Sequence, residues 1–106
     1  MKLAGICDKD TAVALRLAGV QELYIPNGDA VKIWNQLSER DDIGVVFISE
    51  KIAEDISREL KKFRLMYSIP IIVEIPDKKG RRKDHIDYIS HLIKKAVGID
   101  IRSKER

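Results

Sequence analysis

Cysteine is almost absent from this 106-residue sequence, which contains Cys7 and no other. A single cysteine cannot form an intramolecular disulfide, so the chain is predicted to reside in a reducing compartment such as the cytoplasm. Histidine is nearly as scarce, with only His85 and His91. These three side chains do not form the ligand cluster that a structural zinc ion requires, so no metal site is predicted.

Long hydrophobic runs are also missing. No apolar segment approaches the ~20 residues that span a bilayer. Asp8 interrupts the apolar start of the chain too early for a secretory signal peptide. We therefore expect no direct insertion into a membrane. Cys7 ends that apolar start, and a core residue is favoured over a nucleophile because no histidine lies near it in the sequence.

Phosphate-binding glycine motifs are the third absence. The six glycines form neither G-x-G-x-x-G nor G-x-x-x-x-G-K-[ST]. Without such a loop, the backbone has no close approach to a pyrophosphate or a triphosphate. No nucleotide and no other cofactor is predicted, and no set of residues indicates a catalytic site.

Charge is present in abundance but is unevenly distributed. Residues 1–77 hold ten Lys or Arg and thirteen Asp or Glu, a net charge of −3. Residues 78–106 hold ten Lys or Arg and four Asp or Glu, a net charge of +6. This asymmetry is typical of a basic segment that meets an acidic partner, although a solvated face would look the same.

Apolar runs alternate with amphipathic segments along most of the chain. Strands are predicted at residues 2–7, 21–25, 43–48 and 70–75, and a helix at residues 11–18. A second helix, capped by Asp29 or Gly28, is predicted to run to about Glu39. Ser49 is predicted to cap a third helix, whose apolar stripe runs from Ile52 to Phe63. A last amphipathic helix is predicted over residues 84–97.

Apolar strands that alternate with helices predict an α/β fold, with a parallel sheet covered by helices on both faces. Right-handed crossovers make it a single small Rossmann-like or flavodoxin-like sandwich of four strands, with sheet order 2-1-3-4. We expect residues 1–76 to form this core, residues 77–83 a charged loop, and residues 84–106 a C-terminal arm.

Two alternative functions follow from the residues themselves. The first is a receiver-like signalling module, because Asp8 and Asp10 follow the first strand as the metal-binding acidic pair does in such modules. Ser49 and Glu50 oppose this interpretation, because they stand at the end of the third strand, where a receiver needs its phosphoaccepting aspartate. The basic loop at residues 78–83 could contact nucleic-acid phosphates. No aromatic residue is interleaved there for base stacking, which weakens that interpretation.

The end of the chain favours a protein partner. Ile99 and Ile101 lie beyond Gly98, where the helix is expected to stop, and they are surrounded by charged residues. Apolar side chains in this position are typical of a segment that docks on another protein. Arg16 also stands out, because it lies in an apolar helix and is expected either to reach solvent or to pair with an acidic group at an interface.

Four segments in order give the chain its resemblance. These are "RLAGV" (residues 16–20), "IGVVFISEKIAEDI" (43–56), "IPIIVEIP" (69–76) and "LIKKAVGIDI" (92–101). With them the sequence resembles the F subunit of the archaeal and vacuolar-type rotary ATPases. The resemblance implies a non-catalytic component of the central stalk, cytoplasmic and peripheral to the cell membrane, that takes part in coupling ATP synthesis or hydrolysis to ion transport.

The resemblance also implies partners. The D subunit of the central stalk is the expected main partner. The C-terminal helix is expected to contact the catalytic A/B head and tune its activity. The C subunit is expected as a further partner at the base of the stalk. No nucleic acid is expected in the complex. The residues predicted to contact partners lie on the first helix, the second strand and the arm: Arg16, Leu23, Tyr24, Ile25, Ile89, Ile93, Val97, Ile99 and Ile101.

Overall fold

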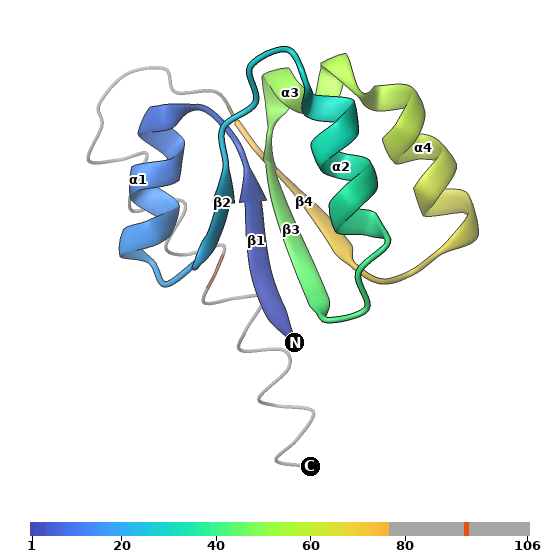
Figure 1. The fold of residues 1–106 in the computed structure, drawn as a ribbon, viewed down its shortest axis with the longest axis horizontal. Helices are drawn as coiled ribbons and strands as arrows, with labels where there is room; N and C mark the ends of the chain where they lie inside the picture. Colours follow the sequence, from blue (N-terminus) through green and yellow to red (C-terminus); the bar gives the residue numbers. More distant parts are fainter. Residues whose placement is uncertain (77–92, 94–106) are drawn as a thin grey trace.

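The computed structural model describes residues 1–76 and Ile93. Strands and helices follow one another along this part of the chain (Figure 1). The elements are β1 (Lys2–Ile6), α1 (Lys9–Leu17), β2 (Glu22–Tyr24), α2 (Ala30–Ser38), β3 (Ile43–Ser49), α3 (Glu50–Asp55), α4 (Ser57–Met66) and β4 (Ile71–Ile75).

All strand pairs are parallel, and the sheet has the order β2-β1-β3-β4. Gly5 of β1 lies in register with Leu23 of β2 on one side and with Phe47 of β3 on the other. The predicted fold class and strand order are thus confirmed. β2 and β4 form the two edges of the sheet among the described strands.

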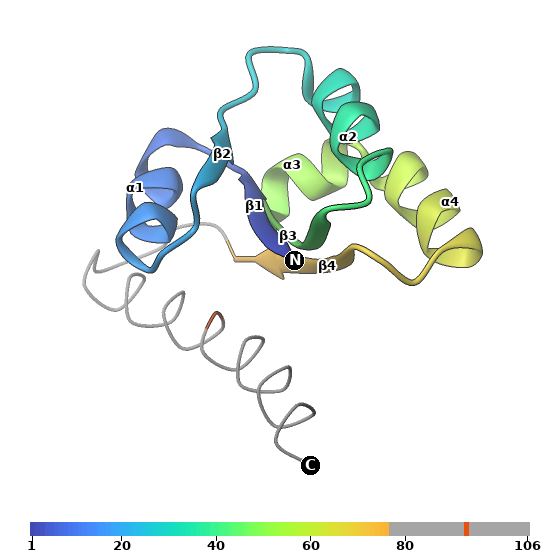
Figure 2. The same ribbon diagram turned by 60° about the horizontal axis from the view of Figure 1, so that its bottom comes forward.

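The alternation of side chains along the strands creates two separate cores. One face of the sheet packs against α2, α3 and α4, which lie together beside β3 and β4 (Figure 2). Its buried members are Ala4, Ile6, Trp34, Leu37, Ile43, Val46, Ile48, Ala53, Ile56 and Leu60. The other face packs against α1, through Cys7, Ala12, Ala14, Leu15, Val20, Phe47, Ile75 and Ile93.

The start of α1 is fixed by a capping interaction. Asp8 is the N-cap, and its carboxylate accepts hydrogen bonds from the backbone N–H and the hydroxyl of Thr11, at 3.3 and 2.5 Å. A carboxylate here satisfies a free helix donor and lies at the positive end of the helix dipole. The helix ends at Leu17 with Ala18 as its C-cap, and Gly19 follows with a φ of +108°, a conformation that favours glycine.

The helix predicted over residues 50–63 is divided in two. The structure ends α3 at Asp55 and begins α4 at Ser57, with Ile56 at φ −115° and ψ 28° between them. The backbone bonds from Ile56 to Ile52 and from Leu60 to Ile56 are still formed, at 3.1 and 3.0 Å. Ile56 and Leu60 are buried, as the apolar stripe predicted, but the division of the helix at Ile56 was not predicted.

The last predicted elements lie outside the described residues. This applies to the charged loop at 77–83 and to the helix at 84–97, apart from Ile93. Ser49 occupies the predicted N-cap position of α3 but makes no side-chain cap bond, and it is also the buried last residue of β3. In the described part of the chain, no helix combines the length and the apolar character that crossing a bilayer requires.

Candidate partner-binding surface

The β2 edge carries three of the predicted contact residues. Leu23 and Tyr24 are half-buried and pack on opposite faces of the sheet. Leu23 packs on the face covered by α1, here called the α1-side core, and Tyr24 packs on the face covered by α2, α3 and α4. Ile25 follows the strand and is exposed. The strand pairs with β1 on one side, and no described strand pairs with its other side. An edge of this kind is open to contact with another chain.

An ionic network fixes the start of this edge. Arg40 donates to both oxygens of the Glu22 carboxylate, at 2.5 and 3.0 Å, and to both oxygens of Asp42, at 2.9 and 2.7 Å. The Tyr24 hydroxyl donates to Glu22 at 3.1 Å. The Lys2 ammonium lies 3.8 Å from Glu22 and 3.6 Å from Asp42. The network thus holds β2, β1 and the start of β3 in a defined arrangement.

The pKa values respond to this network. The hydrogen bonds from Arg40 lower the pKa of Glu22 and bring the pKa of Asp42 down to about 2. The same bonds, to Glu22 first and then to Asp42, raise the pKa of Arg40. All three groups are therefore charged at neutral pH, and the network acts as a fixed ionic surface rather than as a proton-transfer site.

Arg16 lies on the exposed side of α1 and forms no ion pair with a described residue. Val13 and Leu17, one helical turn apart, are exposed beside it. Sequence reasoning missed these two residues, although their four-residue spacing was a signal that could have found them. Together with Arg16 they give α1 an exposed surface that is apolar and carries a cation, next to β2 (Figure 1).

Of the predicted contact residues in the arm, the structure describes Ile93. Ile93 is only 5% exposed and packs into the α1-side core with Leu15, Val20 and Phe47. In this chain its side chain covers the sheet rather than lying at the surface, and its contact with a partner stays a prediction. The other predicted arm contacts lie outside the described residues: Ile89, Val97, Ile99 and Ile101.

The carboxyl ends of the strands, where α/β folds commonly bind ligands, form a cleft of about 490 Å³. Cys7 lines it, and burial, followed by the nearby Asp8 charge, raises the pKa of its thiol to about 12. The thiol is therefore protonated at neutral pH and is a poor nucleophile. Buried Ser49 ends β3 where a receiver module would need its aspartate. Among the described residues, no group of three or more possible metal ligands comes together.

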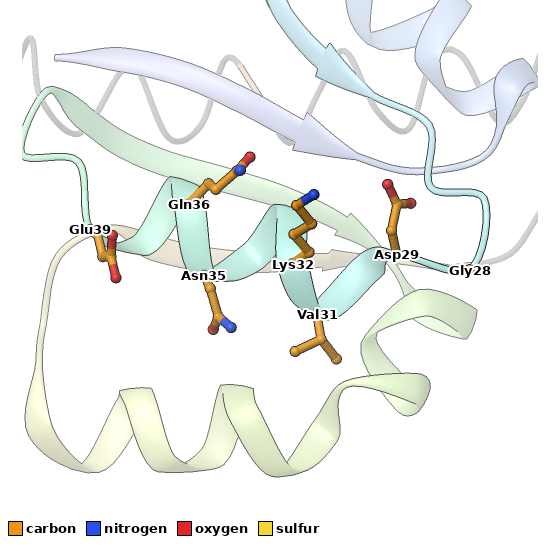
Figure 3. Close-up of a pocket in the computed structure, with 7 residues that line it drawn as sticks. All are labelled: Gly28, Asp29, Val31, Lys32, Asn35, Gln36 and Glu39. Carbon is orange, nitrogen blue, oxygen red and sulfur yellow. The ribbon is translucent and has the colours of Figure 1, made fainter.

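A second pocket, of about 580 Å³, lies on the exposed side of α2. Figure 3 shows Val31 and Asn35 pointing toward α4, whereas Lys32 and Gln36, which also line the pocket, point away from α4. Asp29 at its rim accepts a hydrogen bond from the backbone N–H of Asn27 at 2.8 Å, which fixes the turn before α2. The polar groups do not converge on one point, so the pocket does not have the arrangement of a catalytic site.

Apolar side chains exposed on rigid elements, next to a charged and fixed sheet edge, are typical of an α/β protein that acts by binding other proteins. Residues 3–93 match the family model described as "ATP synthase (F/14-kDa) subunit". The chain therefore belongs to this family of ATP synthase F subunits, which confirms the family predicted from the four sequence segments.

Relatives match nearly end to end. The A-type ATP synthase F subunit of Methanocaldococcus jannaschii is 38% identical over 104 residues, covering 96% of this chain and 100% of the relative. The A-type ATP synthase F subunits of Pyrococcus abyssi and Thermococcus kodakarensis are 36% and 32% identical, each match covering 96% of this chain and 99% of the relative. Family membership makes the chain a non-catalytic subunit of an ATP synthase complex.

Proposed function

We propose that this chain is the central-stalk F subunit of an A-type ATP synthase, that it binds the D subunit, and that it turns with D as part of the rotor. The observation that carries the proposal is the nearly full-length match to proteins named as F subunits of A-type ATP synthases. A rotor subunit transmits torque, so its contact with D should reach at least the standard interface size, roughly 1,600 Å² in total.

The described surface supports a docking role for α1 and the β2 edge. Val13 and Leu17 are exposed apolar side chains on α1, and Ile25 is exposed directly after β2. Arg16 adds a cation that an acidic partner group can bind. The Glu22–Arg40–Asp42 network keeps the edge in one conformation before binding. A preorganised surface loses less conformational entropy on association, which favours a long-lived complex.

The experiment that tests the main proposal is co-expression of this chain with the D subunit of the same organism, followed by gel filtration. A stable one-to-one complex supports the rotor assignment. A double substitution, Val13→Ser with Leu17→Ser, should weaken that complex, whereas Leu65→Ser on α4, at the opposite end of the molecule, should not. Elution of this chain alone over a range of salt concentrations would reject the assignment.

We also propose that the arm, residues 84–106, is a regulatory element that contacts the catalytic A/B head. The C subunit is a further proposed partner of the chain, at the base of the stalk. A regulatory arm needs two positions that differ by only a few kcal/mol. Ile93 supports this, because burying one isoleucine contributes about 1.5–3 kcal/mol. A contact of that size can hold the arm on the sheet and still be released.

Deletion of residues 98–106 tests the division of labour between the two parts. The shortened chain should bind the D subunit as the full chain does, and the assembled complex should hydrolyse ATP at a changed rate. Loss of D binding in the deletion would show that these residues belong to the main contact and not to a regulatory arm.

A further inference from the structure

Exposed apolar residues gather at the connection between α4 and β4. Leu65, Met66, Tyr67, Ile69 and Ile71, here called the α4–β4 surface, are between 53% and 87% exposed. They are five of the ten large apolar side chains that are exposed in the described part of the chain, and they fall within seven consecutive positions. Single exposed apolar residues are ordinary, but a concentration of this kind marks an interaction site.

Tyr67 is held in place within this surface. Its ring stacks on Phe63, with centroids 5.2 Å apart and planes at 29°. Phe63 in turn meets the buried ring of Trp34 edge to face, at 5.1 Å and 85°. A ladder of three rings therefore runs from the core to the surface. An exposed aromatic side chain that is already oriented is the kind of group that anchors protein interfaces.

The surroundings of the α4–β4 surface are basic. Four of the ten residues of α4 are Lys or Arg and one is acidic, and the four basic side chains are exposed. Arg64 pairs with Glu74 at 3.4 Å. The other three (Arg58, Lys61 and Lys62) pair with no described acidic residue. The complementary surface is therefore apolar in the middle and acidic at its border.

The α4–β4 surface lies far from α1 and from the β2 edge. β4 and β2 are opposite edges of the sheet, and both ribbon views place α1 and α4 at opposite ends of the molecule (Figures 1 and 2). A partner on α1 and β2 therefore leaves the α4–β4 surface accessible, and one copy of the chain can hold two proteins at once.

We propose that the α4–β4 surface binds a second protein partner, a component of the same complex other than D, through an apolar face bordered by Asp and Glu side chains. The inference rests on the proposed function for the identity of the first partner. Two contacts on opposite edges would hold the α/β domain between two other proteins. Such an arrangement resists rotation of the domain relative to either protein.

The test uses the full-length chain and two immobilised probes. One is the isolated D subunit, and the other is the ATP synthase of the same organism prepared without its F subunit, here called the F-less complex. The main variant is Leu65→Ser with Met66→Ser and Tyr67→Ser, and a charge variant is Lys61→Glu with Lys62→Glu. Val31→Ser is the matched control, because it removes an exposed apolar side chain from another helix. Urea unfolding of each variant checks that the fold is kept.

We expect the triple variant to bind the F-less complex at least tenfold more weakly, with binding to D changed by less than twofold. The charge variant should show the same selective loss and a weaker dependence on salt, and Val31→Ser should match the wild type on both probes. Unchanged binding of the triple variant to the F-less complex would overturn the proposal. An equal loss on both probes would also overturn it, because the surface would then belong to the D contact.

Two further readouts separate the remaining possibilities. If the wild type binds phosphatidylglycerol vesicles and the triple variant does not, while both bind the F-less complex equally, the surface recognises lipid and the proposal is wrong. If the wild type fails to bind isolated D, the proposed function is rejected, and binding to the F-less complex still decides the role of the α4–β4 surface.

Discussion

Arg40 binds both oxygens of the Glu22 carboxylate, at 2.5 and 3.0 Å, although the two residues are 18 positions apart. The same guanidinium binds both oxygens of Asp42. Glu22 begins β2, and Asp42 directly precedes β3, on the other side of β1 in the sheet. One side chain thus joins the amino ends of strands that are not neighbours. Bidentate geometry of this kind requires arginine and cannot be reproduced by lysine.

The first prediction is a loss of stability in acid that depends on Arg40. Glu22 and Asp42 have a lower pKa in the folded chain than their ordinary values of 4.5 and 3.8. Their contribution to the free energy of unfolding is therefore complete above about pH 4.5 and is lost as the pH falls toward 2. The urea midpoint of the wild type should fall more steeply over this range than that of Arg40→Met.

Arg64→Met is the matched control, because Arg64 makes a single 3.4 Å contact with Glu74 on the exposed surface. Its urea midpoint should keep the acid dependence of the wild type. Equal slopes for the wild type and Arg40→Met between pH 5 and 2 would show that the network does not depress the two pKa values.

The second prediction concerns Gly5 in β1. A Cβ atom at this position would lie 2.8 Å from Leu23 Cδ2 and 2.9 Å from Leu15 Cδ1. Leu15 is fully buried, so it has little room to move. Gly5→Ala should therefore lower the free energy of unfolding by about 1–3 kcal/mol, as overpacking of a core does. Urea unfolding measures it.

Gly44→Ala provides the comparison. Its new Cβ would also come within 2.8 Å of another atom, the Cβ of Met1, but Met1 is the exposed first residue and can shift as a whole. We expect a change within about 0.5 kcal/mol, the usual range for surface substitutions. A loss at Gly44 as large as that at Gly5 would contradict the idea that burial of the neighbour decides the cost.

Much of the fold could be predicted from the sequence, because continuous apolar runs and helical periods determine which segments are strands and which are helices. The segment at 43–48 was apolar throughout, and it is β3, one of the two interior strands of the sheet. The break at Ile56 could not be predicted, because the apolar period of residues 52–63 continues across it. The deviation is a local backbone turn that leaves both Ile56 and Leu60 buried.

The surfaces were harder to predict than the fold. The Glu22–Arg40 pair depends on the sheet order and register, which bring together residues that are far apart in sequence. The α4–β4 surface was missed for another reason. Leu65 and Met66 look like any apolar residues at the end of a helix, and only the three-dimensional packing shows that they are exposed.

The third prediction addresses Ile93 and the arm. Ile93→Ala removes most of the one described arm contact with the α1-side core, at a cost of about 2 kcal/mol or more. A loss of about 2 kcal/mol raises the population of the released arm about 30-fold. Trypsin cleavage at Lys94 and Lys95 should accelerate accordingly when opening is faster than cleavage. Val13→Ala, at an exposed position, should leave the cleavage rate unchanged.

The last prediction uses Cys7 as a probe of the folded state. Its thiol is fully buried, and burial together with the nearby Asp8 charge raises its pKa to about 12. At pH 8 the buried thiol is therefore protonated, and the reactive thiolate forms only when the chain opens and exposes Cys7 to water. Ellman's reagent should therefore react with the native chain only as fast as the chain opens, and reach completion at once in concentrated urea.

Variants that lower the free energy of unfolding, such as Gly5→Ala, should accelerate the native reaction in proportion to their unfolding constant. A rapid reaction in the native wild type, independent of such variants, would contradict the buried position of Cys7 and with it the packing of α1 on the sheet.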